Sequence, residues 1–248
     1  MKSSVLLAAI FFAQTTLADN LKICFESWRP YAEIGANKVA EGSTIDFWNE
    51  AAKKAGHSIE WVKMPPERCW VEVKSGKMSG SLFGSPGDHK ELVYTKTITE
   101  YWLVAAIVNA ANPMTKFNGI DEFKGKSVGT TSGYSYPEAL KGFAGLKIEE
   151  TPDASNSLRK LDAGRIDVTF DDPVWADFES KSNKFKLKIL PPVVAQDPTY
   201  LVLGPTHKAL ADSLDKAAAE LIKGGSLDKL YQKYQGISFA DFKKRYGL

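Results

Sequence analysis

The side chains best suited to hold a ligand follow expected strands or begin expected helices. Trp28 and Tyr31 follow the first expected strand, and ligands of α/β proteins gather at the carboxyl ends of parallel strands. An aromatic ring there can cover an apolar or cationic part of a ligand, or it can serve packing alone. Arg68 lies in the first turn of an expected helix, where the helix dipole does not favour a cation. We therefore expect a ligand, or a carboxylate such as Glu26, to hold Arg68.

A second group of candidates offers hydroxyls and free backbone amides. Ser85 can donate a hydrogen bond from the loop after another expected strand, unless it is only a turn residue. Thr131, Ser132 and Gly133 precede an expected helix, and the free N–H groups of a helix N-terminus favour an anion. The same residues suit simple N-capping, so both roles stay open.

Evidence for catalysis is sparse in this sequence. The three histidines, His57, His89 and His207, are widely spaced and none lies near a cysteine, so we expect no metal site and no cofactor. An enzyme needs a positioned acid or base, and only His89 is expected near a cleft. Glu26 and Glu67 could serve, but no neighbouring residue prepares them for that role. Binding is therefore favoured over chemistry.

The N-terminus has the pattern of a secretory signal peptide. Lys2 precedes the apolar stretch 5–13, and Thr16-Leu17-Ala18 places small residues where a signal peptidase cuts. We expect residues 1–18 to be removed and the protein to be free rather than lipid-anchored; the alternative is a buried N-terminal helix. The remaining chain is almost neutral, with 32 basic and 30 acidic residues in the full sequence, so nothing favours binding to nucleic acid.

Cys24 and Cys69 are the only cysteines. Export would place them in an oxidising compartment, where a pair is more often a disulfide than two free thiols. Two buried, unpaired cysteines remain the alternative.

Strand and helix signals alternate along the chain, which predicts parallel or mixed sheets covered by helices. The expected strands are 21–25, 59–64, 78–83, 126–130 and 166–170, and the expected helices are 45–55, 67–75, 136–143, 155–163, 208–223 and 227–234.

This organisation indicates two similar lobes. Residues 75–79 and 163–167 both read small-Gly-basic-apolar-polar, and each links a helix to a strand at a corresponding place in its series. Two extended apolar segments, 97–109 and 190–203, lie between the series and suit a hinge. We expect the C-terminal helices to return to the first lobe.

Six short motifs, in this order and spacing, resemble the bacterial extracellular solute-binding proteins of family 3. They are 28–31 (WRPY), the helix from Gly42 to Gly56, 74–77 (KSGK), 126–129 (KSVG) with Gly133, 161–167 (LDAGRID) and 224–230 (GGSLDKL) before Lys233-Tyr234. Arg68-Cys69 with Cys24 also resembles a subgroup with cysteine in the first strand and second helix, which supports the disulfide.

The resemblance implies a type II periplasmic binding protein fold. Each lobe would be a mixed five-stranded sheet flanked by helices, with two hinge strands joining the lobes. Lobe 1 would comprise 19–101 and 199–248, and lobe 2 would comprise 102–198. A monomer in the periplasm would close on a small polar solute, an amino acid or a related compound, and deliver it to an ABC transporter permease. A ligand-sensing partner of a membrane receptor, or a dehydratase-like enzyme on the same fold, are the alternatives.

The resemblance also assigns ligand contacts. Amino-acid binders of this family pair the ligand carboxylate with an arginine of lobe 1 and the ligand ammonium with an aspartate of lobe 2. The aspartate matches Asp172, although Asp171 could make the contact while Asp172 caps a helix. The arginine has no clean match. The carboxylate clamp is therefore missing, replaced by Lys90 or supplied by Arg68, and a lysine cannot form arginine's bidentate fork. This departure weakens the case for an ordinary amino acid.

Overall fold

The computed structural model describes residues 19–85, 87, 89–132, 134, 136–137, 140 and 145–248. The predicted signal peptide, Gly133 and most of the predicted helix 136–143 lie outside these residues. Within the described part of the chain, no helix is long and apolar enough to cross a membrane.

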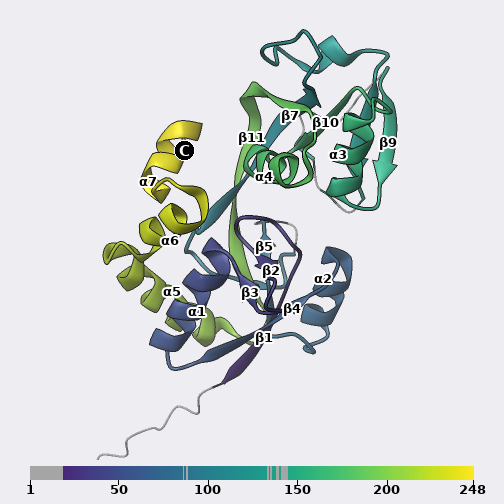
Figure 1. The fold of residues 1–248 in the computed structure, drawn as a ribbon. Coiled ribbons are helices and arrows are strands. Elements are labelled where there is room, and N and C mark those ends of the chain that lie inside the picture. The colour runs from purple at the N-terminus through teal and green to yellow at the C-terminus, as the bar shows by residue number, and fades with distance from the viewer. Residues whose placement is uncertain are drawn as a thin grey trace, which may run out of the picture.

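The first lobe is built on a mixed sheet (Figure 1). Strand β1 pairs in parallel with β4 and β5, while β11 runs antiparallel to β5 and β6. The strands are β1 (Asn20–Phe25), β4 (Ser58–Lys63), β5 (Gly80–Gly84), β6 (Val93–Tyr94) and β11 (Leu187–Leu203). The helices are α1 (Ser43–Lys54), α2 (Pro66–Lys74), α5 (Lys208–Lys223), α6 (Ser226–Gln235) and α7 (Phe239–Tyr246). A small hairpin, β2 (Glu33–Ile34) and β3 (Ala40–Glu41), precedes α1.

The second lobe repeats this plan. Strand β8 pairs in parallel with β9 and β10, and β7 runs antiparallel to β10 and β11. Its elements are β7 (Glu100–Asn109), a 3-10 helix (Ile120–Phe123), β8 (Ser127–Thr131), β9 (Lys147–Thr151), α3 (Ala154–Asp162), β10 (Val168–Asp171) and α4 (Pro173–Asn183). The predicted α/β architecture, with a mixed sheet in each lobe, is confirmed.

Strands β7 and β11 run from one lobe to the other as neighbours (Figure 1). They pair from Glu100 and Thr199 to Asn109 and Leu187, with an irregularity between Leu190 and Ala195. The two sheets therefore form one path of hydrogen-bonded strands. The predicted lobe boundaries, at 101/102 and 198/199, stay predictions.

The crossover is held by a buried carboxylate. Glu100 is fully buried at the start of β7 and accepts hydrogen bonds from the hydroxyls of Thr44, Thr99 and Thr199. Burial raises the pKa of Glu100, and these three hydrogen bonds oppose the rise. Because Thr44 belongs to α1 and Thr199 to β11, the carboxylate ties both crossover strands to the first lobe.

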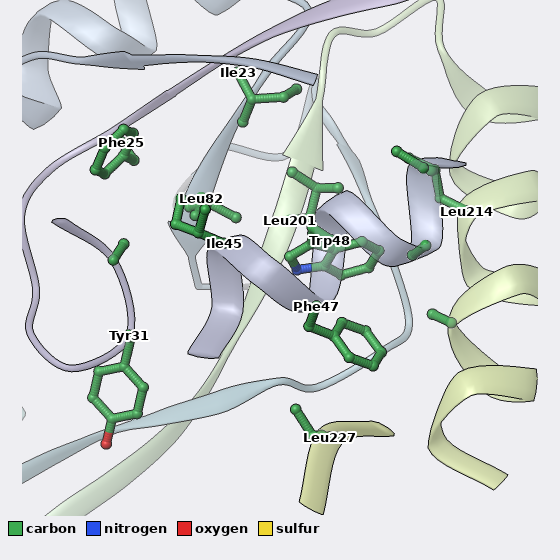
Figure 2. Packing of buried hydrophobic residues seen from close by; sticks show 14 of the residues in the cluster. Ile23, Phe25, Tyr31, Ile45, Phe47, Trp48, Leu82, Leu201, Leu214 and Leu227 are labelled. Carbon is green, nitrogen blue, oxygen red and sulfur yellow. The ribbon is translucent and has the colours of Figure 1, made fainter. Parts of the chain in front are cut away.

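The core of the first lobe lies between its sheet and α1 (Figure 2). Trp48 and Phe47 of α1 are fully buried among Ile23 of β1, Leu201 of β11 and Leu214 of α5. Strand β7 organises the second lobe, because Val104, Ala106 and Val108 face one cluster while Ile107 faces the other.

Candidate ligand-binding cleft

A cleft of about 800 Å³ lies between residues of the two lobes. From the first lobe it is lined by 26–29, 63–66, 69–70, 81–83 and 85, and from the second by 131–132, 134, 152–155, 159, 171, 175 and 179. Trp102 and Thr199 of the crossover strands complete the lining. This volume suits a small organic molecule.

Two carboxylates approach each other in this cleft. Glu26 follows β1 of the first lobe, and Asp171 ends β10 of the second. Burial raises the pKa of Glu26 to about 7; the negative charge of Asp171 adds to this rise, and a hydrogen bond from the Tyr134 hydroxyl opposes it. Burial also raises the pKa of Asp171 to about 7, against a hydrogen bond from the Asp172 amide (2.7 Å). Among the described residues, no cationic side chain lowers either pKa.

Aromatic side chains form much of the remaining wall. Trp28 packs edge-on against Phe83, with ring centroids 4.8 Å apart, and it contacts core residues of both lobes. Phe83 has a φ of 66°, in the left-handed region that a bulky residue rarely adopts. Such an outlier costs of order 1 kcal/mol or more and is characteristic of functional sites. Trp70, Trp102 and Trp175 also line the cleft.

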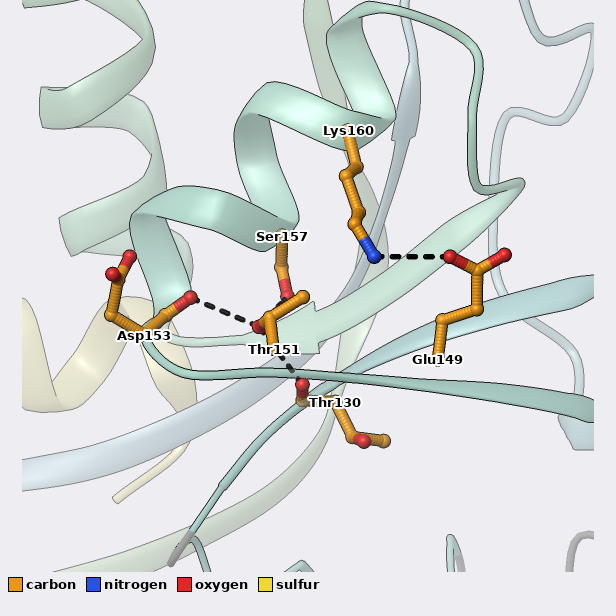
Figure 3. Close-up of polar contacts among 6 residues, drawn as sticks. All are labelled: Thr130, Glu149, Thr151, Asp153, Ser157 and Lys160. Atoms are coloured by element: carbon orange, nitrogen blue, oxygen red, sulfur yellow. Dashed lines mark hydrogen bonds and ion pairs between the residues drawn. The ribbon is translucent and has the colours of Figure 1, made fainter.

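The second lobe contributes a polar wall. Thr151, at the end of β9, donates to the carbonyl oxygens of Thr130 and Asp153 and lies 2.8 Å from the Ser157 hydroxyl (Figure 3). These bonds fix the segment 152–155, which lines the cleft at the start of α3. An ion pair between Lys160 and Glu149 (3.1 Å) joins α3 to β9 on the outer side.

Thr131 carries an unsatisfied hydroxyl in the cleft. Its side chain is buried, and Oγ1 finds no hydrogen-bond partner in the described part of the chain. A buried, unpaired polar atom costs about 1–3 kcal/mol, so natural structures rarely keep one without a use. We therefore expect this hydroxyl to bind the ligand.

Replacing Thr131 with Val tests this expectation without a ligand. Val has the same shape and no hydroxyl, so the free energy of unfolding should stay within about 0.5 kcal/mol or rise by about 1 kcal/mol. Urea unfolding of the ligand-free protein measures it, with Thr131→Ser as the variant that retains the hydroxyl. A loss above 1 kcal/mol in Thr131→Val alone would show that the hydroxyl already has a structural partner.

Four predicted site residues line the cleft together: Trp28, Ser85, Thr131 and Ser132. Gly133 lies outside the described residues. The other four, Tyr31, Arg68, Lys90 and Asp172, do not line it. Their ligand roles stay predictions, and their placement gives each a different local function.

Tyr31 and Asp172 are buried beside the cleft rather than in its wall. Tyr31 belongs to the first-lobe core, where its ring contacts Trp28 at 4.7 Å. Asp172 caps α4 by accepting a hydrogen bond from the Trp175 amide (2.7 Å). Burial raises the pKa of Asp172 to about 8. Asp172 is therefore the helix cap of the alternative interpretation, and Asp171 lines the cleft. A ligand contact by Asp171 stays a prediction.

The two cations suggested to replace the arginine clamp do not line the cleft. Arg68 is exposed and pairs with Glu72 at 3.8 Å on its own helix. Lys90 is exposed in the loop after β5. The basic residues that do line the cleft are Arg29, Lys63 and Arg159, which the sequence analysis did not select. Arg29 pairs with Glu33 and lies over the Phe178 ring of α4, 5.6 Å from its centroid.

The predicted disulfide is confirmed. Cys24 of β1 and Cys69 of α2 are bonded across 45 positions of sequence, and Cys69 lines the cleft. Both cysteines are buried in a cluster with Val73, Leu92 and Val202.

The family of this chain follows from comparison with known sequences. The profile of the bacterial extracellular solute-binding proteins, family 3, matches residues 21–237. The chain belongs to this family. It is a family of non-enzymatic solute-binding proteins.

Individual relatives differ in coverage. The L-cystine-binding proteins TcyK and TcyJ of Bacillus subtilis are 30% and 32% identical over 128 and 138 residues. These matches cover 49% and 56% of this chain, and the chain spans less than half of either relative, 47% and 44%. The histidine-binding periplasmic protein of Escherichia coli is 24% identical over 236 residues, 90% of each chain.

Solved structures show the fold alone. An ancestral arginine-binding protein bound to arginine superposes with a TM-score of 0.77 at 24% identity, covering 87% of this chain and 98% of its own. A histidine kinase sensor domain similar to periplasmic binding proteins gives 0.79 at 18% identity, with 88% and 97% covered. The fold is therefore that of type II periplasmic binding proteins, as the sequence predicted.

Proposed function

We propose that this protein is a periplasmic solute-binding protein that captures an amino acid or related amine and delivers it to an ABC transporter permease. A cationic group of the ligand, an ammonium or a guanidinium, would lie between Glu26 and Asp171. The observation that supports this proposal is the pair of cleft carboxylates, the half-buried Glu26 and the buried Asp171, because no cationic side chain among the described residues lowers the pKa of either.

The electrostatics favour a cation over other ligand groups. A positive charge between the two carboxylates would lower the pKa of both and replace their mutual repulsion with attraction. Trp28 and Phe83, beside Glu26, would cover the apolar part of such a ligand. Lys63 and Arg159 line the same cleft and are the candidates to bind a ligand carboxylate in place of the family's arginine.

Export and closure of the two lobes complete the proposed function. Residues 1–18 would direct export and be cleaved after Ala18, leaving a monomer in the periplasm. The boundaries at 101/102 and 198/199 would divide the lobes that close on the ligand by a hinge motion of β7 and β11. The names of the relatives, which include cystine-, arginine- and histidine-binding proteins, support the ligand class.

A thermal-shift screen at pH 8 tests the proposal. At about 100 times its dissociation constant, a true ligand adds about 2.7 kcal/mol of stability. We expect shifts from arginine, lysine or polyamines and none from succinate or glutarate, which carry no cationic group. Shifts from the acidic solutes only would contradict a cation site at Glu26 and Asp171, and the Asp171→Asn variant should lose any shift that a cationic solute produces.

A further inference from the structure

Helix α2 forms part of the cleft wall but has few buried contacts of its own. It contributes Pro66, Cys69 and Trp70 to the lining. Of its nine residues, only Cys69 and Val73 are buried. A helix this short is marginal without tertiary packing. Its position therefore depends on these two side chains and on the half-buried Trp70, which packs against the same cluster and contacts the His89 ring at 4.5 Å.

The polar contacts of α2 add little to that anchoring. Arg68 and Lys77 pair with Glu72, and Lys74 pairs with Glu91 at 2.9 Å, but all three basic side chains are exposed. Surface pairs of this kind contribute about 0–1 kcal/mol. The covalent bond from Cys69 to Cys24 is therefore the strongest connection between α2 and the rest of the lobe.

The other end of the disulfide lies in a rigid part of the molecule. Cys24 is fully buried in β1, which pairs with β4 on one side and β5 on the other. Cys24 is two positions before Glu26, and Cys69 directly precedes Trp70. The bond thus joins the strand that presents the carboxylate to the helix that presents an aromatic wall. The Cys69 sulfur also lies 3.0 Å from the hydroxyl of Ser81, another lining residue.

We infer that the disulfide is a positioning device for the ligand site, so that ligand affinity depends on the oxidation state of Cys24 and Cys69. This inference rests on the proposed function. A dithiol such as dithiothreitol would transfer two electrons and two protons to the bond, giving two cysteine thiols and the cyclic disulfide of the reagent. Strand β1 would stay in its sheet, while α2 would lose its main anchor and the wall with Trp70 would loosen.

The effect of reduction should be local, because the cysteines lie outside the main core of the first lobe. That core contains Trp48, Phe47 and Ile23, whereas the cysteines pack in a separate cluster with Val73 and Val202. Local opening of a weakly packed segment is possible while the rest of the lobe stays folded.

Hydrogen exchange of oxidised and dithiothreitol-reduced full-length protein tests this inference. We expect reduction to speed the exchange of amides of 66–74 by about tenfold or more beyond any change that the general loss of stability causes in α3 and α5. The Cys24→Ser/Cys69→Ser double variant should reproduce the pattern. Leu214→Ala, a buried core position on α5 away from the cleft, is the control for a general loss of stability.

Binding of L-arginine to the same samples provides the second measurement. We expect its affinity to fall about tenfold or more on reduction and to be retained in Leu214→Ala. Unchanged protection of 66–74 in the reduced protein, or equal loosening in Leu214→Ala, would overturn the inference. If oxidised protein binds neither L-arginine nor L-lysine nor a polyamine, the proposed ligand class fails, and the exchange data still decide whether the disulfide holds the α2 wall.

Discussion

Replacing Glu26 with Gln should stabilise the ligand-free protein at pH 8 by about 3 kcal/mol. Burial raises the pKa of Glu26 from 4.5 to about 7. Between these pH values the folded protein holds a proton that the unfolded chain releases, so stability falls as pH rises through this window. This rise in pKa lowers the free energy of unfolding at pH 8 by about 3 kcal/mol. Gln keeps the shape and removes the ionisation.

Urea unfolding at pH 4, 6 and 8 measures this effect. The difference in the free energy of unfolding between Glu26→Gln and wild type should grow with pH and reach its full size above pH 7. The reason is that burial destabilises only the charged form of Glu26. Asp171→Asn should behave in the same way, since burial raises the pKa of Asp171 to about 7. Glu67→Gln, at an exposed position, is the control. Equal stability of Glu26→Gln and wild type at pH 8 would show that a cation already neutralises the site.

Glu26→Gln should also weaken ligand binding, although it stabilises the ligand-free protein. A group that costs stability in the free protein is retained when it has a functional use. The ionised form that destabilises the ligand-free cleft is the form that a cationic ligand needs. Affinity for such a ligand should therefore increase with pH through about 7, in the opposite direction to the stability of the free protein.

Elements with a clear apolar face could be predicted from the sequence, and others could not. Helix α1 and strand β1 bury a large part of their side chains, and both were predicted within two residues of their ends. Helix α7 buries only Phe242, and the edge strand β9 buries only Thr151. Strand β9 has no alternating apolar pattern, and it was not predicted. Helix α7 was also missed, although Phe239, Phe242 and Tyr246 have helical spacing and Ser238 with Asp241 carries a capping signal that could have revealed it.

The site shows a similar limit. Polar residues at the ends of strands could be identified, and Thr131 and Ser132 indeed line the cleft. The choice between Asp171 and Asp172 could not be made, because consecutive residues point to opposite sides and the strand end decides which one faces the cleft. Asp172 followed by Pro173 at the first helical turn is a capping signal, and it favours Asp171 as the cleft residue.

Basic residues of the cleft were missed for a different reason. Lys63 and Arg159 are exposed residues on β4 and α3, far apart in sequence, and they share a cleft only because the lobes meet there. No local pattern distinguishes them from other surface cations. The family resemblance directed attention to Lys90, which lies a few residues before Leu92 where the arginine is expected, and to Arg68, but neither lines the cleft.

Removal of the disulfide should lower the free energy of unfolding by about 4 kcal/mol. The bond closes a loop of 45 residues, and the loss of chain entropy in the unfolded state gives a value of this size. Urea unfolding of Cys24→Ser/Cys69→Ser against oxidised wild type measures the loss, and reduced wild type is the control for the substitutions themselves. A loss below 1 kcal/mol would mean that the reduced chain remains compact around β1 and α2.

The size of this loss and its location are separate measurements. The chain-entropy effect acts on the unfolded state and destabilises the whole lobe uniformly. Loss of the bond also acts on the folded state, because Cys69 is one of only two buried side chains that anchor α2. A variant that loses about 4 kcal/mol but keeps 66–74 protected relative to other helices would assign the disulfide to global stability alone. Selective exposure of 66–74 at a pH and urea concentration where α1 stays protected would assign it to the ligand site as well.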